Sequence, residues 1–208
     1  MNTRLRLVVP TAEKRTIDTP RRQKNAELRT REHLSEGEIE RLMEAARKNR
    51  EGHRNALMIL MAYRHGLRAS ELVDLQWSQI ELGTSVIHIR RVKNGTPATH
   101  PLTGRELRAL RKLQREAPAG SAFVFVSMRG TPFTVSGFRR MLERAAVEAR
   151  MEDLKVHPHM LRHAAGYQLA NQGTDTRTIQ AYLGHRNISN TVRYTALSAS
   201  RFKGLFRD

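Results

Sequence analysis

Hydrophobic residues recur at helical spacing along most of the chain after residue 33. The first such segment follows a capping box at Ser35, with Glu38 three residues after the cap, and its apolar positions are Ile39, Leu42, Met43 and Ala46. A second helix is predicted from about residue 54 to 64, ending at Gly66. Caps and periodicity predict further helices at about 69–75, 103–115, 134–149, 158–172 and 176–183, and a last short helix leading to Tyr194.

Two segments carry an extended pattern instead. Val86, Ile87 and Ile89 are β-branched, and the following Lys93-Asn94-Gly95-Thr96 has the Asn-Gly pair of a hairpin turn, so residues 98–102 are the predicted return strand. Residues 123–126, Phe-Val-Phe-Val, predict a short buried strand. The expected fold class is mostly α with a small antiparallel β-sheet, an α+β arrangement.

Composition adds exclusions and one strong indication. The sequence has no run of 18 apolar residues and no secretory signal, which predicts no membrane partner. Cysteine is absent, which excludes disulfides and thiolate metal sites and favours a cytoplasmic location. The 37 Lys and Arg against 20 Asp and Glu give a net charge of +17, which attracts phosphate polyanions. The charge indicates nucleic-acid binding, or else a basic protein such as a ribosome-associated one.

The charge is uneven, which suggests a domain boundary. Residues 1–31 carry nine Lys and Arg against three Asp and Glu, are interrupted by Pro10 and Pro20, and sustain no apolar period. We expect residues 1–33 to form a basic arm that orders on DNA, or else a plain disordered terminus. Residues 34–208 are the predicted folded domain, ending in a tail at 197–208 with apolar positions Leu197, Phe202, Leu205 and Phe206.

Several polar residues stand where a core pattern favours apolar ones. Taken singly, each has an ordinary explanation: a solvated arginine, a capping histidine, a core tyrosine. The histidines also permit a metal site, with His159 and His163 one turn apart and His157 nearby, but Arg162 between them would repel a cation. We expect no metal and no cofactor. The candidates are Arg68, Lys93, His159, Arg162, His185 and Tyr194.

Together, these residues resemble one family. Their order, and the contexts Gly-Leu-Arg-Ala-Ser-Glu-Leu, His-Met-Leu-Arg-His, Leu-Gly-His and Arg-Tyr-Thr, are similar to the active-site series of the tyrosine recombinases, or phage-integrase-type recombinases. The resemblance covers about residues 34–206. The stretch from Lys93 to Leu102 and the short chain further resemble the small fimbrial phase-variation recombinases. Most family members carry a separate N-terminal helical domain, for which 33 residues are too few.

The resemblance implies a chemistry for each residue. Tyr194 would attack a DNA phosphate and form a covalent 3′-phosphotyrosine, with Arg68 and Arg162 stabilising the charge that develops. His159 would accept the tyrosine proton or bind the phosphate, Lys93 would protonate the leaving 5′-oxygen, and His185 would donate to a non-bridging oxygen. Glu71 would orient a neighbouring cation.

The resemblance also implies partners. We expect double-stranded DNA with specific recombination sites as the substrate. We expect a free protein that is monomeric or weakly associated, assembly into a tetramer on DNA, and a cytoplasmic, nucleoid-associated location. Whether the reaction inverts, excises or integrates a segment stays open. Two alternatives are a DNA-binding accessory protein that retains the fold and a type IB topoisomerase-like activity.

Overall fold

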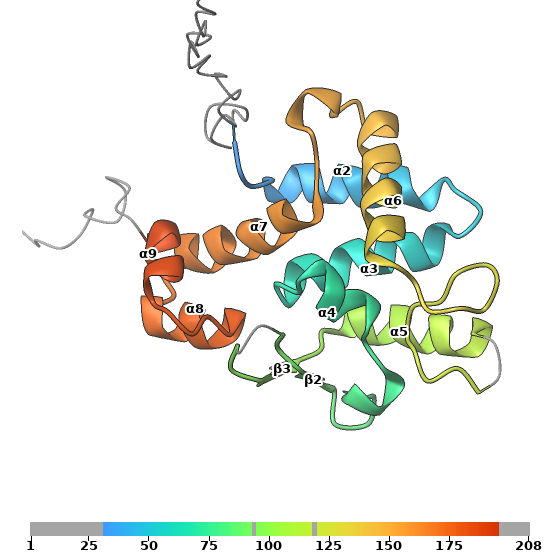
Figure 1. Ribbon diagram of the computed structural model, residues 1–208, viewed down its shortest axis with the longest axis horizontal. Coiled ribbons are helices and arrows are strands. Elements are labelled where there is room, and N and C mark those ends of the chain that lie inside the picture. The colour runs from blue at the N-terminus through green and yellow to red at the C-terminus, as the bar shows by residue number, and fades with distance from the viewer. Residues whose placement is uncertain (1–30, 93–94, 118–119, 196–208) are drawn as a thin grey trace, which may run out of the picture.

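The computed structural model describes residues 31–92, 95–117 and 120–195 (Figure 1). Most of the predicted basic arm, Lys93 at the hairpin turn and the predicted tail therefore lie outside the described residues. The helices are α2 (Glu36–Arg47), α3 (Gly52–Arg64), α4 (Ala69–Val73), α5 (Gly104–Glu116), α6 (Val135–Glu148), α7 (Pro158–Asn171), α8 (Thr176–Leu183) and α9 (Ser189–Thr195). They confirm the predicted helices to within a few residues.

Local signals in the sequence explain where several helices begin and end. Ser35 caps α2, its hydroxyl accepting from the Glu38 backbone N–H while the Glu38 carboxylate accepts from the Ser35 N–H. Thr103 and Glu106 form the same capping box at α5. After α3 the chain turns at Gly66, whose φ of +56° lies in the left-handed region that glycine adopts without strain. The turn carries the chain directly into α4.

A three-stranded antiparallel sheet packs below the helices in Figure 1, in the order β1 (Ile80–Glu81), β2 (Val86–Ile89) and β3 (Ala98–Pro101). In the register Ile87 pairs with His100 and Ile89 with Ala98. Ile87 and Ile89 are buried, so one face of β2 points into the core. The predicted hairpin and the predicted fold class are confirmed.

Two details of the predicted sheet are wrong. Residues 123–126 form no strand: Phe123 and Val126 make single bridges to Gln76 and Pro132, while Val124 and Phe125 are fully buried. The apolar run reflects burial inside a loop, which periodicity alone cannot distinguish from a strand. The two-residue β1 went unpredicted because it is too short to show alternation.

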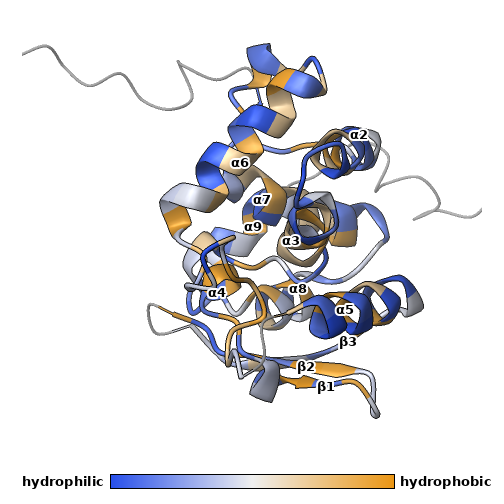
Figure 2. Ribbon diagram, turned by 90° about the vertical axis from the view of Figure 1, so that its right-hand side faces the viewer, coloured by the Kyte–Doolittle hydropathy of each residue, from blue (hydrophilic) through white to orange (hydrophobic). Residues whose placement is uncertain are grey.

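The core centres on α3, whose residues are buried on nearly every side between α2, α5 and α7. Figure 2 shows hydrophobic residues along β1 and β2 at the lower edge of this view and mostly hydrophilic residues along α5 above them. Helices α8 and α9 lie at one end, against α7 (Figure 1). In the described part of the chain, no helix is long and apolar enough to cross a bilayer.

Candidate active site

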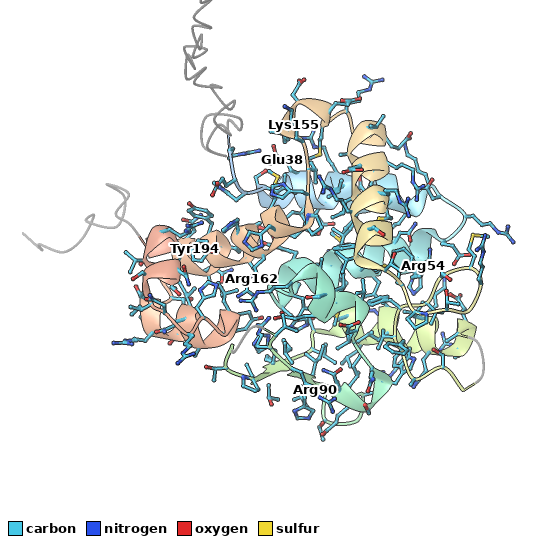
Figure 3. The ribbon with its side chains drawn as sticks, in the orientation of Figure 1. Glu38, Arg54, Arg90, Lys155, Arg162 and Tyr194 are labelled. Atoms are coloured by element: carbon cyan, nitrogen blue, oxygen red, sulfur yellow. The ribbon has the colours of Figure 1, made fainter. Side chains whose placement is uncertain are left out.

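A cavity of about 230 Å³ lies where the start of α4, α7, the end of α8 and α9 meet. Figure 3 shows two of its residues, Arg162 and Tyr194, on the same side of the molecule. Three arginines line the cavity, and none of its described lining residues is acidic. The lining thus combines five of the six predicted site residues with three others: Arg68, His159, Arg162, His163, His185, Asn190, Arg193 and Tyr194.

The two predicted arginines reach the cavity by different routes. Arg162 on α7 is 2% exposed, and its terminal nitrogens donate to the carbonyls of Gly66 (2.5 Å) and Leu183 (2.6 Å). Each of these nitrogens carries a second hydrogen, which remains for an anion. Burial, followed by the charges of Arg68 and Arg91, lowers the Arg162 pKa to about 9. Arg68 caps α4 and keeps its side chain partly exposed.

One buried carboxylate organises this region. Glu71 accepts from the Arg68 backbone N–H (3.0 Å) and from the Arg68 guanidinium (2.6 Å). It also accepts from Arg91 (2.9 Å) and from the Val92 N–H (3.2 Å). Although burial opposes its charge, these donors hold the Glu71 pKa below its usual value, so it stays ionised. Glu71 thus contacts a neighbouring cation, as the sequence predicted.

Tyr194 lies flat against α7. Its ring occupies the space where a side chain at Gly166 would be, because a Cβ there would come within 2.7–2.8 Å of three ring atoms. Tyr167 closes a further side in an edge-on contact, with ring centroids 5.2 Å apart. Tyr194 is only 5% exposed, and burial raises its pKa to about 12. In this position its hydroxyl is protonated at neutral pH.

The hydroxyl of Tyr194 contacts His163, lying 2.8 Å from Nδ1. Burial, followed by the charge of His159, lowers the His163 pKa to about 3, so the ring is neutral. Its Nδ1 accepts a hydrogen bond from the tyrosine hydroxyl in the tautomer that carries its hydrogen on Nε2. From the sequence, His163 is expected only in the rejected metal site, and His159 is expected to accept the tyrosine proton or bind the phosphate. The one-turn spacing of the two histidines was the available signal, but it was considered only for metal ligands and not for a contact with Tyr194.

The other two histidines complete the cavity. The His159 ring contacts that of His163 edge-on at 4.6 Å and keeps one side in solvent. Burial of the packed side of the ring, and then the charge of Arg162, lower the pKa of His159 to about 4. Nδ1 of His185 lies 2.9 Å from the Thr191 hydroxyl, which leaves Nε2 for another partner. Its pKa is also lowered to about 4, by burial and then by Arg162.

The cavity does not resemble a metal site. In the described ranges, no three His, Cys, Asp or Glu side chains are grouped so that they would hold a metal ion. The cations of Arg68, Arg162 and Arg193 fit an anion instead, and a phosphate carries the oxygens that guanidinium groups pair with.

Comparison with known proteins identifies the chain. Residues 32–201 match the family model described as the phage integrase family. The chain belongs to this family. Type 1 fimbriae regulatory protein FimE of Escherichia coli (strain K12) is 43% identical over 181 residues, covering 85% of this chain and 91% of FimE. FimB of the same strain is 42% identical over 185 residues, covering 87% and 92%.

More distant relatives support the same family assignment. Tyrosine recombinase XerC of Staphylococcus haemolyticus is 32% identical over 175 residues, covering 82% of this chain and 59% of XerC. The crystal structure of XerA recombinase superposes with a TM-score of 0.70 at 30% identity, covering 81% of this chain and 61% of that one. XerH bound to its difH substrate gives 0.71 at 23% identity, covering 84% and 53%, and so supports the fold. The chain is a tyrosine-type site-specific recombinase, as the resemblance predicted.

Proposed function

We propose that this recombinase cuts and rejoins duplex DNA through a covalent 3′-phosphotyrosine formed by Tyr194. The observation that carries the proposal is the single cavity that joins Tyr194 to Arg68, Arg162 and two of the predicted histidines. These side chains come from four separate parts of the fold. Their convergence is what a phosphoryl transfer needs: a nucleophile beside preorganised cations.

The arginines would bind the scissile phosphate and stabilise the charge that develops on its oxygens. Arg162 remains cationic at neutral pH, since even its lowered pKa is about 9. A bound phosphate would also act on the neighbouring titrating groups. The charges of Arg162 and other cations help to lower the pKa values of His159 and His185, and an anion among them would raise those values again.

The tyrosine hydroxyl contacts His163, but a ring with a pKa of about 3 is too weak a base to hold its proton. We therefore assign the proton to His159, whose ring lies against that of His163 and whose pKa a bound phosphate would raise. The oxygen would then bond to phosphorus, and the 5′-oxygen of the DNA would leave. We assign protonation of that oxygen to Lys93, which lies outside the described residues. A 5′-hydroxyl from another strand would reverse the step, so the phosphodiester energy is conserved and no ATP is needed.

We further propose that residues 34–208 form the catalytic domain, that the basic arm contacts DNA phosphates, and that a tetramer assembles on two specific DNA sites. XerH was solved bound to its difH substrate and the Tn1549 transposon integrase in complex with transposon right end DNA, which supports a DNA partner here. Inverted sites would give inversion, direct sites excision, and sites on separate duplexes integration. We place this reaction on nucleoid DNA in the cytoplasm.

A nicked duplex carrying the recombination site tests the chemistry, because the 5′ fragment diffuses away and traps the adduct. Wild-type protein should form a covalent complex that survives denaturation, and Tyr194→Phe should bind the duplex without forming one. An adduct that persists in the variant would refute the nucleophile. Absence of any wild-type adduct would favour the accessory-protein alternative, and relaxation of plasmids lacking the site would favour the topoisomerase.

Sulfur substitution tests Lys93 separately. Lys93→Ala should slow cleavage, and a 5′-bridging phosphorothioate should restore it, because a thiolate leaves without needing a proton. Arg68→Ala should stay slow on the same substrate and serves as the control. A Lys93→Ala variant that the sulfur fails to rescue would remove Lys93 as the general acid.

A further inference from the structure

A buried arginine with no role in the proposed chemistry lies next to the cavity. Arg91 follows β2 by two residues, and the alternation that buries Ile87 and Ile89 places it on the same inward face. Its side chain is 0% exposed. Because a buried charge is costly unless it is paired, this arginine is expected to have a specific partner.

The hydrogen bonds of Arg91 all point into the protein. Nη1 donates to Glu71 at 2.9 Å and lies 3.3 Å from the Gly66 carbonyl oxygen. Nη2 donates to the carbonyls of Tyr182 (2.6 Å) and His65 (3.1 Å). The guanidinium therefore joins the end of β2 to α4, to the turn after α3 and to α8. With no exposed surface, it is not positioned to touch DNA.

Two of the four acceptors of Arg91 also lie next to Arg162, the arginine proposed to bind the phosphate. The Gly66 carbonyl accepts from Arg162 as well as from Arg91. Arg162 Nη1 also lies 4.0 Å from Glu71 Oε2, the same oxygen that Arg91 contacts at 2.9 Å. Arg91 thus occupies the position on Glu71 that Arg162 would otherwise approach.

The local charges show what this arrangement achieves. Three arginines surround one carboxylate, leaving a net charge of +2 for a phosphate. Without Arg91 the sum falls to +1, and the buried Glu71, 1% exposed, is left with Arg68 and Arg162 as its cations. In a poorly solvated site a carboxylate draws such cations strongly. Glu71 would then compete with the phosphate for Arg162, in addition to the ion pair that it already forms with Arg68.

Arg91 also fixes the base of the hairpin that carries Lys93. The next residue, Val92, donates its N–H to Glu71. Across the turn, a Cβ on Gly95 would come within 2.8 Å of Arg91 Cβ and of the Gly184 carbonyl oxygen. Gly184 in turn precedes His185 in the cavity. The two ends of the Lys93 turn are therefore packed around the Arg91 side chain.

We propose that Arg91 is a positioning residue of this recombinase: it neutralises Glu71 and occupies the carboxylate oxygen that Arg162 would otherwise approach, so that Arg162 remains available to the DNA phosphate. The inference rests on the proposed phosphotyrosine chemistry. It assigns Arg91 no contact with DNA, so its loss should affect the cleavage rate at saturating DNA more than DNA affinity.

The test measures adduct formation on the nicked duplex at saturating protein, together with DNA affinity and thermal unfolding. Arg91→Met should slow adduct formation on the order of 100-fold, the effect of losing one oxyanion donor. Combining Arg91→Met with Glu71→Gln should recover at least tenfold of that loss, because no buried carboxylate remains to compete. Arg91→Lys, which keeps the charge, should cleave within about tenfold of wild type.

Arg54→Met is the matched control. Arg54 is also a buried arginine bonded to a backbone carbonyl, that of Val126, but lies across the molecule from Arg162 (Figure 3). Both methionine variants should lower the melting temperature, and only Arg91→Met should slow cleavage. Equal cleavage rates for the two variants, or a double variant no faster than Arg91→Met alone, would overturn the proposal.

Two further readouts keep the test decisive. If Arg91→Met alone fails to fold, the change is made in the Glu71→Gln background, where no buried carboxylate is left, and the double variant is compared with Glu71→Gln. There the change should alter cleavage less than about threefold, and a loss near 100-fold would overturn the proposal. Wild-type protein that forms no adduct would refute the phosphotyrosine function instead, which distinguishes that failure from a failure of the Arg91 proposal.

Discussion

The contact between Tyr194 and His163 predicts a measurable coupling between the two side chains. The hydroxyl lies 2.8 Å from Nδ1, and the residues are 5% and 7% exposed. Tyr194→Phe removes the hydroxyl and leaves the buried nitrogen without this partner, which should lower the free energy of unfolding by about 1–3 kcal/mol. In a domain of this size each kcal/mol corresponds to about 2–4 °C in melting temperature.

A double-mutant cycle isolates the contact from the packing of the ring. His163→Leu removes the imidazole, and in that background Tyr194→Phe loses no hydrogen bond, so the two changes should be non-additive by about 1 kcal/mol. Urea unfolding at pH 7.5, followed by circular dichroism, gives the four free energies. Tyr167→Phe is the control: it makes the same chemical change on the neighbouring ring and should add to His163→Leu.

The size of the coupling energy shows whether the Tyr194 hydroxyl contacts His163 in solution. A value within about 0.3 kcal/mol of zero would mean that the tyrosine hydroxyl does not rest on His163 in solution. In the same cycle, both variants with phenylalanine at 194 should form no covalent DNA adduct, whatever their stability.

Three other perturbations follow from the same geometry. Gly166→Ala should cost about 1–3 kcal/mol through overlap with the Tyr194 ring, more than the gain in helix propensity, so a raised melting temperature would contradict it. Arg162→Ala should reduce the adduct-forming rate by about 2.7–4 kcal/mol of transition-state stabilisation, measured in single turnover at saturating DNA. The pKa values of His100 and His163 are lowered from 6.5 to about 3 by burial, so the folded state binds fewer protons than the unfolded state between these values. The free energy of unfolding should therefore fall as pH drops through this window, by up to about 1.4 kcal/mol per pH unit for each histidine, and denaturant curves at pH 7 and 5 that coincide would refute it.

Local chemistry made much of the fold predictable. The capping boxes at Ser35 and Thr103 and the glycine at 66 mark helix boundaries that need only a few neighbouring residues to form. The run at 123–126 misled because Val124 and Phe125 are buried in the core from a loop that makes only isolated bridges. Its apolar pattern would be the same in a buried strand.

The residues of the candidate site also fall into those that the sequence predicted and those that it did not. Residues predicted for their family contexts, such as Arg162 and Tyr194, converge in the cavity. His163 and Arg91 were not recognised, because their importance depends on tertiary contacts: one with a ring from α9, the other with a carboxylate from α4. The alternation of β2 does place position 91 inward, which was the one available signal that a charge would be buried there.

The short helix that carries the tyrosine has a consequence for energetics. At seven residues, α9 is well below the length at which a helix persists alone in water, so it depends on its docking against α7 and α8. Detaching it would break a local set of contacts, while α7 keeps His159, Arg162 and His163 in place through its own packing on α3. The free energy of detaching α9, which carries Tyr194, is therefore separate from the free energy of unfolding the whole domain. Backbone amides of α9 should exchange with solvent well before those of α7, on a timescale that mutations at Gly166 can tune.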